Sequence, residues 1–539
     1  MSRYNYRRRI SGEARVGKIG IGGKNPIRIQ SMTNTSTMDT EGSVAQARRI
    51  AEAGGELVRL TTQGVREADN MKEIRKALDN KDCSVPLVAD VHFNPSAAFK
   101  AVETCEKVRI NPGNFVDPAR TFKKIDFTDE EYAAEIEKIR ETFVPLISKC
   151  KEYNTALRLG VNHGSLSDRI MSRYGDTPEG MVESALEYLR ISRDEGFKDI
   201  VISIKSSNVG VMVKTVELLA ARMEAENMDY PLHLGVTEAG DGEDGRIKSS
   251  VGIGTLLGEG LGDTIRVSLT EDPEKEIPVA RKLRDYIISR EGHIPVPEPQ
   301  TNERNIYNNS VQIPGFEDVN YPLVIGLDIK EVPEKWHMST TEDELFVEDD
   351  LPVVLETTNA NIPGAMASWI ERFRSKGFRN PVILKVKYND EDLEDLQIKA
   401  SADLGPLLLW GYGNGIWIEA KDHSRKDLDS LALGILQAAR LRISKTEYIA
   451  CPGCGRTLFD LQNTLRNVKE ATKEMKGLKI GVMGCIVNGP GEMADADFGY
   501  VGAGPGRVSL YKGKELIKKN IPSEKAIDEL LELIKDSKS

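Results

Sequence analysis

The sequence predicts an α/β protein that begins with a (β/α)8 barrel, continues with an inserted α/β domain and ends with a smaller α+β domain. Three observations support this fold class. Short β-rich runs alternate with amphipathic helical segments from residue 16 to about residue 285. A segment rich in proline and polar residues follows near residue 290, and a segment of different character begins near Thr446. We therefore predict domains at residues 1–285, 286–445 and 446–539.

The first domain contains eight β-rich runs, and helical segments lie between them. Eight such units in about 250 residues are the expected size of a (β/α)8 barrel. Active sites of this fold lie at the C-terminal ends of the strands, so we expect the chemistry there. The runs begin at Pro26, Leu57, Pro86, Lys107, Ala156, Asp199, Pro231 and Asp263.

The middle segment resembles a degenerate repeat of part of the barrel. Residues 254–269 align without gaps on residues 405–420, and a second stretch upstream aligns in the same order. The copy has lost polar groups, since Arg266 falls opposite Trp417. We expect a degenerate barrel duplicate with a structural role, not a second active site. The alternative is that a glycine-plus-strand pattern recurs by chance.

Composition and charge exclude several classes of protein. The chain has 539 residues, which is too many for one core, and its 40% apolar and 29% charged residues are typical of folded soluble proteins. Its formal net charge of -11 argues against nucleic acid or an anionic membrane as a partner. No apolar run is long enough to span a bilayer, and the basic start lacks the apolar stretch of a signal peptide. We therefore expect a cytoplasmic protein.

Three of the six cysteines gather near the C-terminus. Cys451 and Cys454 form a CxxC motif, and Cys485 follows before a glycine-rich loop that contains Glu492. Structural zinc requires four ligands, whereas no histidine occurs after His423. An iron–sulfur cluster can accept a carboxylate or leave one iron open, which makes Glu492 a candidate ligand. A cluster, a zinc site and a cysteine pair without metal are the three open interpretations.

Cationic residues recur on the predicted barrel strands. Strands of one barrel converge, so these charges would point toward one mouth. Buried like charges are costly unless an anion neutralises them, and guanidinium groups bind phosphate oxygens bidentately. The pattern predicts a site for a small molecule that carries two phosphates, although any single arginine could instead pair with a neighbouring acid. The cations are Arg59, Arg109, Arg158, Lys205 and Arg266.

Glu238 lies just past the seventh run, among these cations. Neighbouring positive charge favours the charged form of a carboxyl group. We expect Glu238 to deliver a proton or to orient a hydroxyl group. The alternative role is a salt bridge to one of the arginines.

Several motifs together resemble the 4-hydroxy-3-methylbut-2-enyl diphosphate synthase family of the non-mevalonate isoprenoid pathway. The resemblance covers the first and the third predicted domains. The segment between them fits the longer, three-domain form that is found in plants and some bacteria. The motifs are PIRIQSMTNT, PLVADVHF, VRINPGN, GVNHGSL, PLHLGVTEAG, DTIRVSL, CPGCGRT and MGCIVNGPGE.

The resemblance implies an iron–sulfur oxidoreductase whose electron donor is ferredoxin or flavodoxin. Its substrate would be 2-C-methyl-D-erythritol 2,4-cyclodiphosphate. The ring C–O bond opens, two electrons enter and water leaves, which gives (E)-4-hydroxy-3-methylbut-2-enyl diphosphate. The C-terminal domain would be an iron–sulfur domain resembling sulfite reductase. It would hold a [4Fe–4S] cluster through Cys451, Cys454, Cys485 and Glu492.

The same resemblance assigns roles to individual residues. Glu238 matches the acid/base glutamate, and Glu492 would take part in catalysis by yielding its iron to the substrate. Asn488 would face the substrate from the cluster side. Positions that hold the diphosphate match Arg59, Arg109, Arg158, Asn162, Lys205, Arg266 and Ser268.

The barrel would bind the substrate and the cluster domain would reduce it, so the two domains must close on each other. In the two-domain form of the family this closure uses a partner subunit. We hypothesise that the inserted domain replaces the partner's barrel, and we expect a monomer or a weak homodimer. The second interpretation of the whole chain is a non-redox barrel that binds a phosphosugar or a pterin and carries a structural zinc module.

Overall fold

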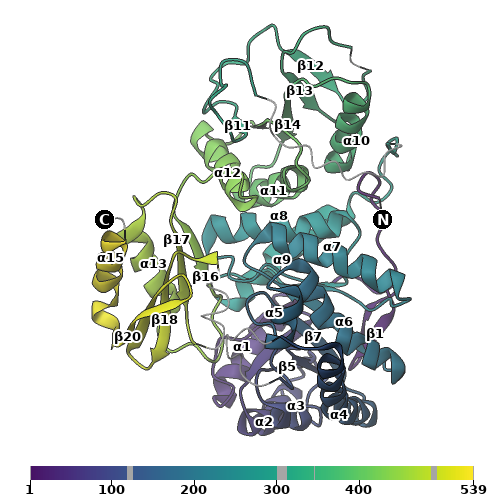
Figure 1. The fold of residues 1–539 in the computed structure, drawn as a ribbon, viewed down its shortest axis with the longest axis vertical. Coiled ribbons are helices and arrows are strands. Elements are labelled where there is room, and N and C mark those ends of the chain that lie inside the picture. Colours follow the sequence, from purple (N-terminus) through teal and green to yellow (C-terminus); the bar gives the residue numbers. More distant parts are fainter. Residues whose placement is uncertain (1, 118–125, 300–311, 345, 487–494, 538–539) are drawn as a thin grey trace. The chain divides into compact units, whose positions relative to one another are not determined.

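The computed structural model describes residues 2–117, 126–299, 312–344, 346–486 and 495–537 (Figure 1). Its contacts divide the chain into two compact units. The barrel unit comprises Ile10–Asp241, Gly262–Ala280 and Lys445–Ser539. The insert unit comprises Met1–Arg9, Gly242–Leu261 and Arg281–Ser444. The domain boundaries predicted at residues 285 and 445 stay predictions.

Eight parallel strands form the barrel, in the order β8-β7-β6-β5-β4-β3-β10-β9. A parallel bridge between Ile202 of β8 and Leu232, which precedes β9, connects the two ends of this sheet. Each of the eight predicted runs contains one of these strands, so the predicted barrel is confirmed. The strands are β3 (Arg28–Met32), β4 (Leu57–Thr62), β5 (Leu87–Val91), β6 (Lys107–Ile110), β7 (Ala156–Asn162), β8 (Ile200–Lys205), β9 (His233–Leu234) and β10 (Thr264–Ile265).

Helices of the barrel unit connect consecutive strands, and their ends carry clear capping signals. Thr128 and Glu131 form a capping box at the start of α4, in which each side chain accepts a hydrogen bond from the other residue's backbone N–H. Thr177 caps α6 by accepting a hydrogen bond from the backbone N–H of Gly180, ahead of a proline at the first helical position. The helices are α1 (Thr40–Glu52), α2 (Val65–Asp79), α3 (Pro95–Ala101), α4 (Asp129–Tyr153), α5 (Asp168–Tyr174), α6 (Pro178–Asp194) and α7 (Val209–Ala225).

A hairpin of two antiparallel strands precedes the barrel, and the sequence did not predict it. The strands are β1 (Glu13–Val16) and β2 (Ile19–Gly22). Their apolar side chains form one buried cluster with residues near the N-terminal ends of four barrel strands. The hairpin thereby closes the N-terminal end of the barrel and leaves the C-terminal end as its mouth. The clustered residues are Ala14, Val16, Ile21, Leu57, Val88, Ala156 and Val201.

The C-terminal part of the barrel unit is a mixed sheet with helices, as the sequence predicted. The strand order is β16-β17-β18-β19-β20, with parallel pairing up to β18 and antiparallel pairing beyond it. Helices α13 (Leu461–Thr472) and α15 (Ala526–Asp536) contribute Leu465 and Leu530 to its core. The strands are β16 (Glu447–Ala450), β17 (Lys479–Met483), β18 (Phe498–Gly504), β19 (Arg507–Lys512) and β20 (Glu515–Pro522).

The insert unit contains a second parallel sheet, in the order β11-β15-β14-β13-β12. Parallel strands alternating with helices are the architecture expected of a partial barrel copy. The strands are β11 (Leu323–Val324), β12 (His337–Thr340), β13 (Val353–Glu356), β14 (Val382–Tyr388) and β15 (Gly415–Ala420). Helices of this unit include α8 (Gly242–Gly258), α10 (Ile362–Ser375), α11 (Leu393–Leu409) and α12 (Arg425–Ala438), while α9 (Glu276–Ile288) continues from the barrel unit into it.

Helices α8 and α11 pack against each other inside the insert unit with reciprocal contacts. A Cβ atom on Gly254 would lie 3.0 Å from Cβ of Ala402. A Cβ atom on Gly405 would lie 2.9 Å from the side chain of Val251. Gly254 and Gly405 are aligned positions of the repeat, and Val251 and Ala402 each stand three residues before them. Exchanging the two helices therefore exchanges the two contacts, which is the property of a two-fold symmetric interface.

Candidate functional site

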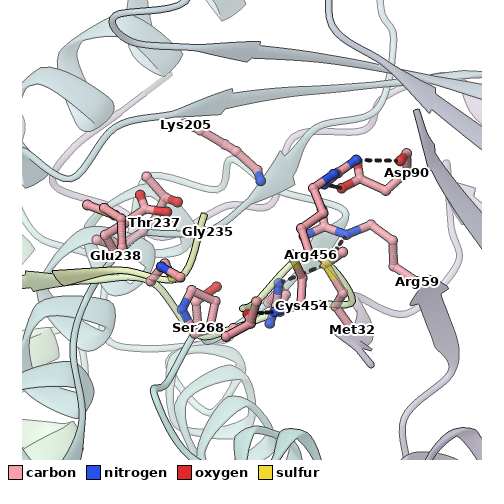
Figure 2. A pocket seen from close by; sticks show the side chains of 18 of the residues that line it. Met32, Arg59, Asp90, Lys205, Gly235, Thr237, Glu238, Ser268, Cys454 and Arg456 are labelled. Carbon is pink, nitrogen blue, oxygen red and sulfur yellow. Dashed lines mark hydrogen bonds and ion pairs between the residues drawn. The ribbon is translucent and has the colours of Figure 1, made fainter. Parts of the chain in front are cut away.

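The mouth of the barrel holds a pocket of about 800 Å³, open to solvent, that belongs entirely to the barrel unit (Figure 2). Barrel strands line one part of the pocket, and the loops after β16 and β17 line another. Nine of the predicted site residues meet here, namely Arg59, Arg158, Lys205, Glu238, Arg266, Ser268, Cys451, Cys454 and Cys485.

Two predicted site residues that the structure describes, Arg109 and Asn162, are not among those that line the pocket. Arg109 and Asn162 are buried on β6 and β7. Asn488 and Glu492 lie outside the described residues. The roles proposed for these four residues stay predictions.

The three predicted arginines of the pocket are deeply buried, Lys205 is half-buried, and several donor groups of the arginines lack partners among the described residues. Neither Nη1 nor Nη2 of Arg158 has a hydrogen-bond partner among the described residues, and the same holds for Nη1 of Arg59. Burial lowers the pKa of Arg59 to about 10. Burial, together with Arg59, Arg109 and Arg158, lowers the pKa of Lys205 well below its ordinary value. A buried donor without a partner is costly, so an anion in the pocket would stabilise this arrangement.

Arg109 is bound within the barrel wall. Its Nη2 donates to the carbonyl oxygen of Gly160 and to Oδ1 of Asn162, both at 2.8 Å. Its Nη1 donates to Oδ1 of Asp90 at 3.1 Å and contacts the ring of His92. In this arrangement Arg109 and Asn162 bind each other, although the sequence grouped both with the diphosphate ligands.

Arg266 forms the ion pair that the sequence left open as an alternative for any single arginine. Its Nε and Nη2 lie 3.0 and 2.9 Å from the two carboxylate oxygens of Glu276. Glu276 is 1% exposed and also accepts a hydrogen bond from Ser31. This bidentate pair orients the guanidinium of Arg266 at the pocket wall.

Glu238 has an unusual backbone for a residue other than glycine. It follows β9 with a φ of 50°, in the left-handed region, and it is 3% exposed. Its Oε2 has no hydrogen-bond partner in the described part of the chain. Such a conformation costs free energy and is often found at functional sites, where the surrounding structure holds it in place. Glu238 therefore presents an available carboxylate oxygen to the pocket.

Two parallel strands bring the cysteines together. Cys451 directly follows β16 and Cys485 lies two residues beyond β17, and these neighbouring strands end at the same edge of the sheet. The backbone N–H of Gly484 donates to Sγ of Cys451 at 3.2 Å. The N–H of Cys454 donates to Oγ1 of Thr457 at 3.0 Å, which fixes the turn of the CxxC motif.

The thiol donors of the three cysteines suit an iron–sulfur cluster. Across the described ranges, no group of three or more His, Cys, Asp and Glu side chains is arranged to hold one ion. A structural zinc site requires four such ligands converging on one atom. An iron–sulfur cluster distributes its thiolates over several irons and is tuned by N–H groups that donate to sulfur. Cys451, Cys454 and Cys485 could therefore hold a cluster at the rim of the pocket.

Arg456 is the main site residue that the sequence did not single out. It lines the pocket beside the cysteines and contacts Asp90 on the barrel. Its position in the CPGCGRT motif was the available signal, but a motif does not say what an arginine binds.

The fold and the pocket define the class of protein, namely a (β/α)8 barrel with cations at its mouth and a cysteine-bearing α+β domain. Residues 11–281 match the family model described as the GcpE TIM-barrel domain. Residues 447–536 match the model described as the GcpE protein C-terminal domain. The chain belongs to the GcpE family, which confirms the family that the motifs indicated.

Curated relatives cover nearly the whole chain. A protein of Bacteroides fragilis is 52% identical over 99% of this chain and 97% of its own length. A protein of Parabacteroides distasonis is 52% identical over 100% of this chain and 99% of its own length. A protein of Leptospira interrogans is 41% identical over 99% of this chain and 97% of its own length. Each relative is named 4-hydroxy-3-methylbut-2-en-1-yl diphosphate synthase (flavodoxin). No helix among the described residues has the length and apolar character needed to cross a membrane.

Proposed function

We propose that the chain converts 2-C-methyl-D-erythritol 2,4-cyclodiphosphate to (E)-4-hydroxy-3-methylbut-2-enyl diphosphate, with reduced flavodoxin as the electron donor. The observation that carries this proposal is the convergence of buried cations, Glu238 and three cysteines on one pocket. The relatives' names support the product and the donor. A barrel that binds a phosphosugar or a pterin without redox chemistry is not favoured, because the relatives are all named as this synthase.

The cations bind and orient the diphosphate. Arg158 offers two unpartnered Nη groups, which suits bidentate binding of phosphate oxygens. Lys205, at the end of β8, adds a third donor group to the same pocket. When the diphosphate binds, its negative charge neutralises these cationic side chains. The binding free energy is therefore concentrated on the diphosphate, away from the carbon atoms that react.

Glu238 is the proton donor of the proposed reaction. One ring C–O bond breaks, two electrons enter, and a hydroxyl group takes one proton and leaves as water. The cyclic diphosphate dianion becomes a linear diphosphate with one more negative charge, so one proton and two electrons balance the equation. We assign delivery of this proton to the free Oε2 of Glu238, which faces the pocket without another partner in the described chain.

A [4Fe–4S] cluster held by Cys451, Cys454 and Cys485, with Glu492 as the fourth ligand, would supply the electrons one at a time. The chain's own contribution at this rim is to hold the sulfur atoms in place. The N–H of Gly484 donates to Sγ of Cys451, and Thr270 donates from Oγ1 to the carbonyl oxygen of Cys451 at 3.0 Å.

The insert unit is proposed to replace the barrel of a partner subunit, and this supports a catalytic unit within one chain. The gap-free alignment of residues 254–269 on residues 405–420 supports the insert as a copy of part of the barrel. The cysteines and the barrel that line the pocket belong to the same chain. We expect a monomer or a weak homodimer by light scattering. An obligate dimer in which Cys485 and Lys205 variants complement each other would contradict this arrangement.

The experiment that tests the function uses anaerobically purified holoenzyme with reduced flavodoxin and the cyclic diphosphate. We expect a brown protein that absorbs near 400 nm and forms the linear diphosphate. The variant Glu238→Gln should keep the cluster and bind inorganic pyrophosphate, while kcat falls by about 10²-fold or more. A colourless zinc protein, or a brown protein without turnover, would contradict the proposal. A cytoplasmic location stays a prediction from the sequence.

A further inference from the structure

Arg456 connects the cysteine loop, defined here as residues 451–457, to the wall of the barrel (Figure 2). Its side chain is 5% exposed. Its Nη2 donates to the carbonyl oxygen of Asp90 at 3.2 Å, and its Nη1 lies 3.7 Å from Oδ2 of the same residue. We propose that Arg456 is a positioning residue that seats the cysteine loop across the barrel mouth by binding Asp90 on β5.

The other end of the cysteine loop is held on the opposite side of the barrel. Ala450 forms a parallel bridge with Ala239, which follows β9. Thr270, which follows β10, donates from Oγ1 to the carbonyl oxygen of Cys451 at 3.0 Å. In the ring of strands, β5 and β9 have three strands between them in either direction. The loop therefore spans the mouth, and Arg456 provides its far attachment.

The fit between the cysteine loop and the barrel is close along its length. A Cβ atom on Gly455 would lie 2.6 Å from the carbonyl oxygen of Thr35 and 3.4 Å from Cβ of Thr61. Any side chain at residue 455 would thus push the loop away from the barrel. Arg456 follows directly, so its hydrogen bond to Asp90 holds the loop at the point of closest approach.

Asp90 is well suited to anchor the loop. It accepts a hydrogen bond from Nη1 of Arg109 at 3.1 Å, and it is 3% exposed. Burial raises the pKa of its carboxyl group, but Arg59 and Arg109 outweigh burial and hold that pKa well below its ordinary value. Asp90 is therefore a fixed anion, bound by one arginine from the barrel and one from the loop.

The inference rests on the proposed function, because seating the loop matters most if electrons must pass from the cysteines to a substrate in the pocket. A misplacement of about 1 Å can reduce a rate by about 10²-fold without weakening substrate binding. Arg456 would then act on kcat through the position of Cys454, two residues before it. A residue that only bound the diphosphate would act mainly on KM.

The test compares Arg456→Met and Arg456→Lys with the wild-type holoenzyme. Arg466→Met, at an exposed position of α13, is the matched control. We expect Arg456→Met to keep the wild-type iron and sulfide content while kcat falls by about 10²-fold and KM changes by about twofold or less. Arg456→Lys keeps the charge and should recover part of kcat. Arg466→Met should match the wild type in all these measurements.

Hydrogen–deuterium exchange on the cluster-free full chain gives a readout that does not depend on turnover. In Arg456→Met, peptides containing residues 33–37 should exchange about tenfold faster, because the loop no longer covers them. Unchanged exchange or unchanged kcat would overturn the proposal, and so would a rise in KM alone or loss of the cluster. If the wild type failed to convert the cyclic diphosphate, the proposed function would fall, while the exchange data would still decide how the loop is seated.

Discussion

Arg109 on β6 donates from Nη1 to Oδ1 of Asp90 on the neighbouring strand β5, at 3.1 Å, and both side chains are buried. On its other side, Arg109 is in register with Arg158 of β7, whose Nη groups have no partner among the described residues. Two arginines at the same level of the barrel therefore differ in state. One is neutralised within the wall, and the other is available to an anion.

Replacing Arg109 should damage the fold more than a surface substitution would. Arg109→Met removes the hydrogen bond from β6 to the buried carboxylate of Asp90 but leaves its contact with Arg456, so we expect a loss of about 1–3 kcal/mol. Chemical denaturation of the cluster-free chain measures this loss. A stability within about 0.5 kcal/mol of the wild type would contradict the structural role of Arg109.

Replacing Arg158 should preserve the stability of the fold and weaken anion binding. Its guanidinium has no carboxylate partner in the described chain at hydrogen-bond distance, and only Nε is bound, to Oγ of Ser203 at 2.9 Å. Arg158→Met should therefore leave the free energy of unfolding unchanged or higher, while the affinity for inorganic pyrophosphate falls by about tenfold or more. Calorimetric titration measures the affinity. Equal pyrophosphate binding by the wild type and this variant would remove Arg158 from the anion site.

Lys107 should make stability depend on pH. It is 0% exposed, its Nζ has no partner in the described residues, and the charged or titratable groups that influence it are Arg158, Arg59 and His233. Burial, with Arg158 and Arg59, lowers its pKa well below the ordinary 10.5. Between its lowered pKa in the folded state and 10.5, the unfolded chain therefore binds more protons at this lysine than the native chain does, so its contribution to stability rises with pH across that interval.

Lys107→Met removes this penalty, because methionine fills a similar volume and carries no charge. We expect the variant to gain about 1–3 kcal/mol at pH 7. The gain should shrink as pH rises toward 10.5. Urea denaturation at several pH values measures the difference, with Lys138→Met on the exposed face of α4 as the control. A gain that does not vary with pH would show that Lys107 is charged in the folded state.

Cys485→Ser should lose the cluster and retain the barrel. The sulfur is lost at the rim of the pocket, whereas the strands and the hairpin that hold the barrel do not depend on it. We expect iron content to fall to background with an unchanged far-ultraviolet circular dichroism spectrum. Cys105→Ala, which changes a buried cysteine after α3, should keep the iron and serves as the control. Wild-type iron content in Cys485→Ser would exclude Cys485 as a ligand.

Local patterns predicted most of the architecture. The eight barrel strands could be found because each is a short apolar run between helical segments. The β1–β2 hairpin was missed because its strands have only four residues each, too short a stretch for their alternation to stand out. The repeat in the middle segment predicted a parallel α/β unit, but not the reciprocal packing of α8 and α11.

The sequence by itself determined the barrel, the family and the set of candidate residues, because strand periodicity and motif spacing are local properties of the chain. Only the tertiary structure decided which buried arginines pair within the barrel wall and which remain available to an anion. It assigned Arg109 to the barrel wall and left Arg158 open to the pocket, since the state of a buried arginine depends on the neighbouring strands. It also brought Arg456 to Asp90, 366 residues away. Burial makes it costly to leave such a charge without a partner, and burial is decided only when distant segments pack together.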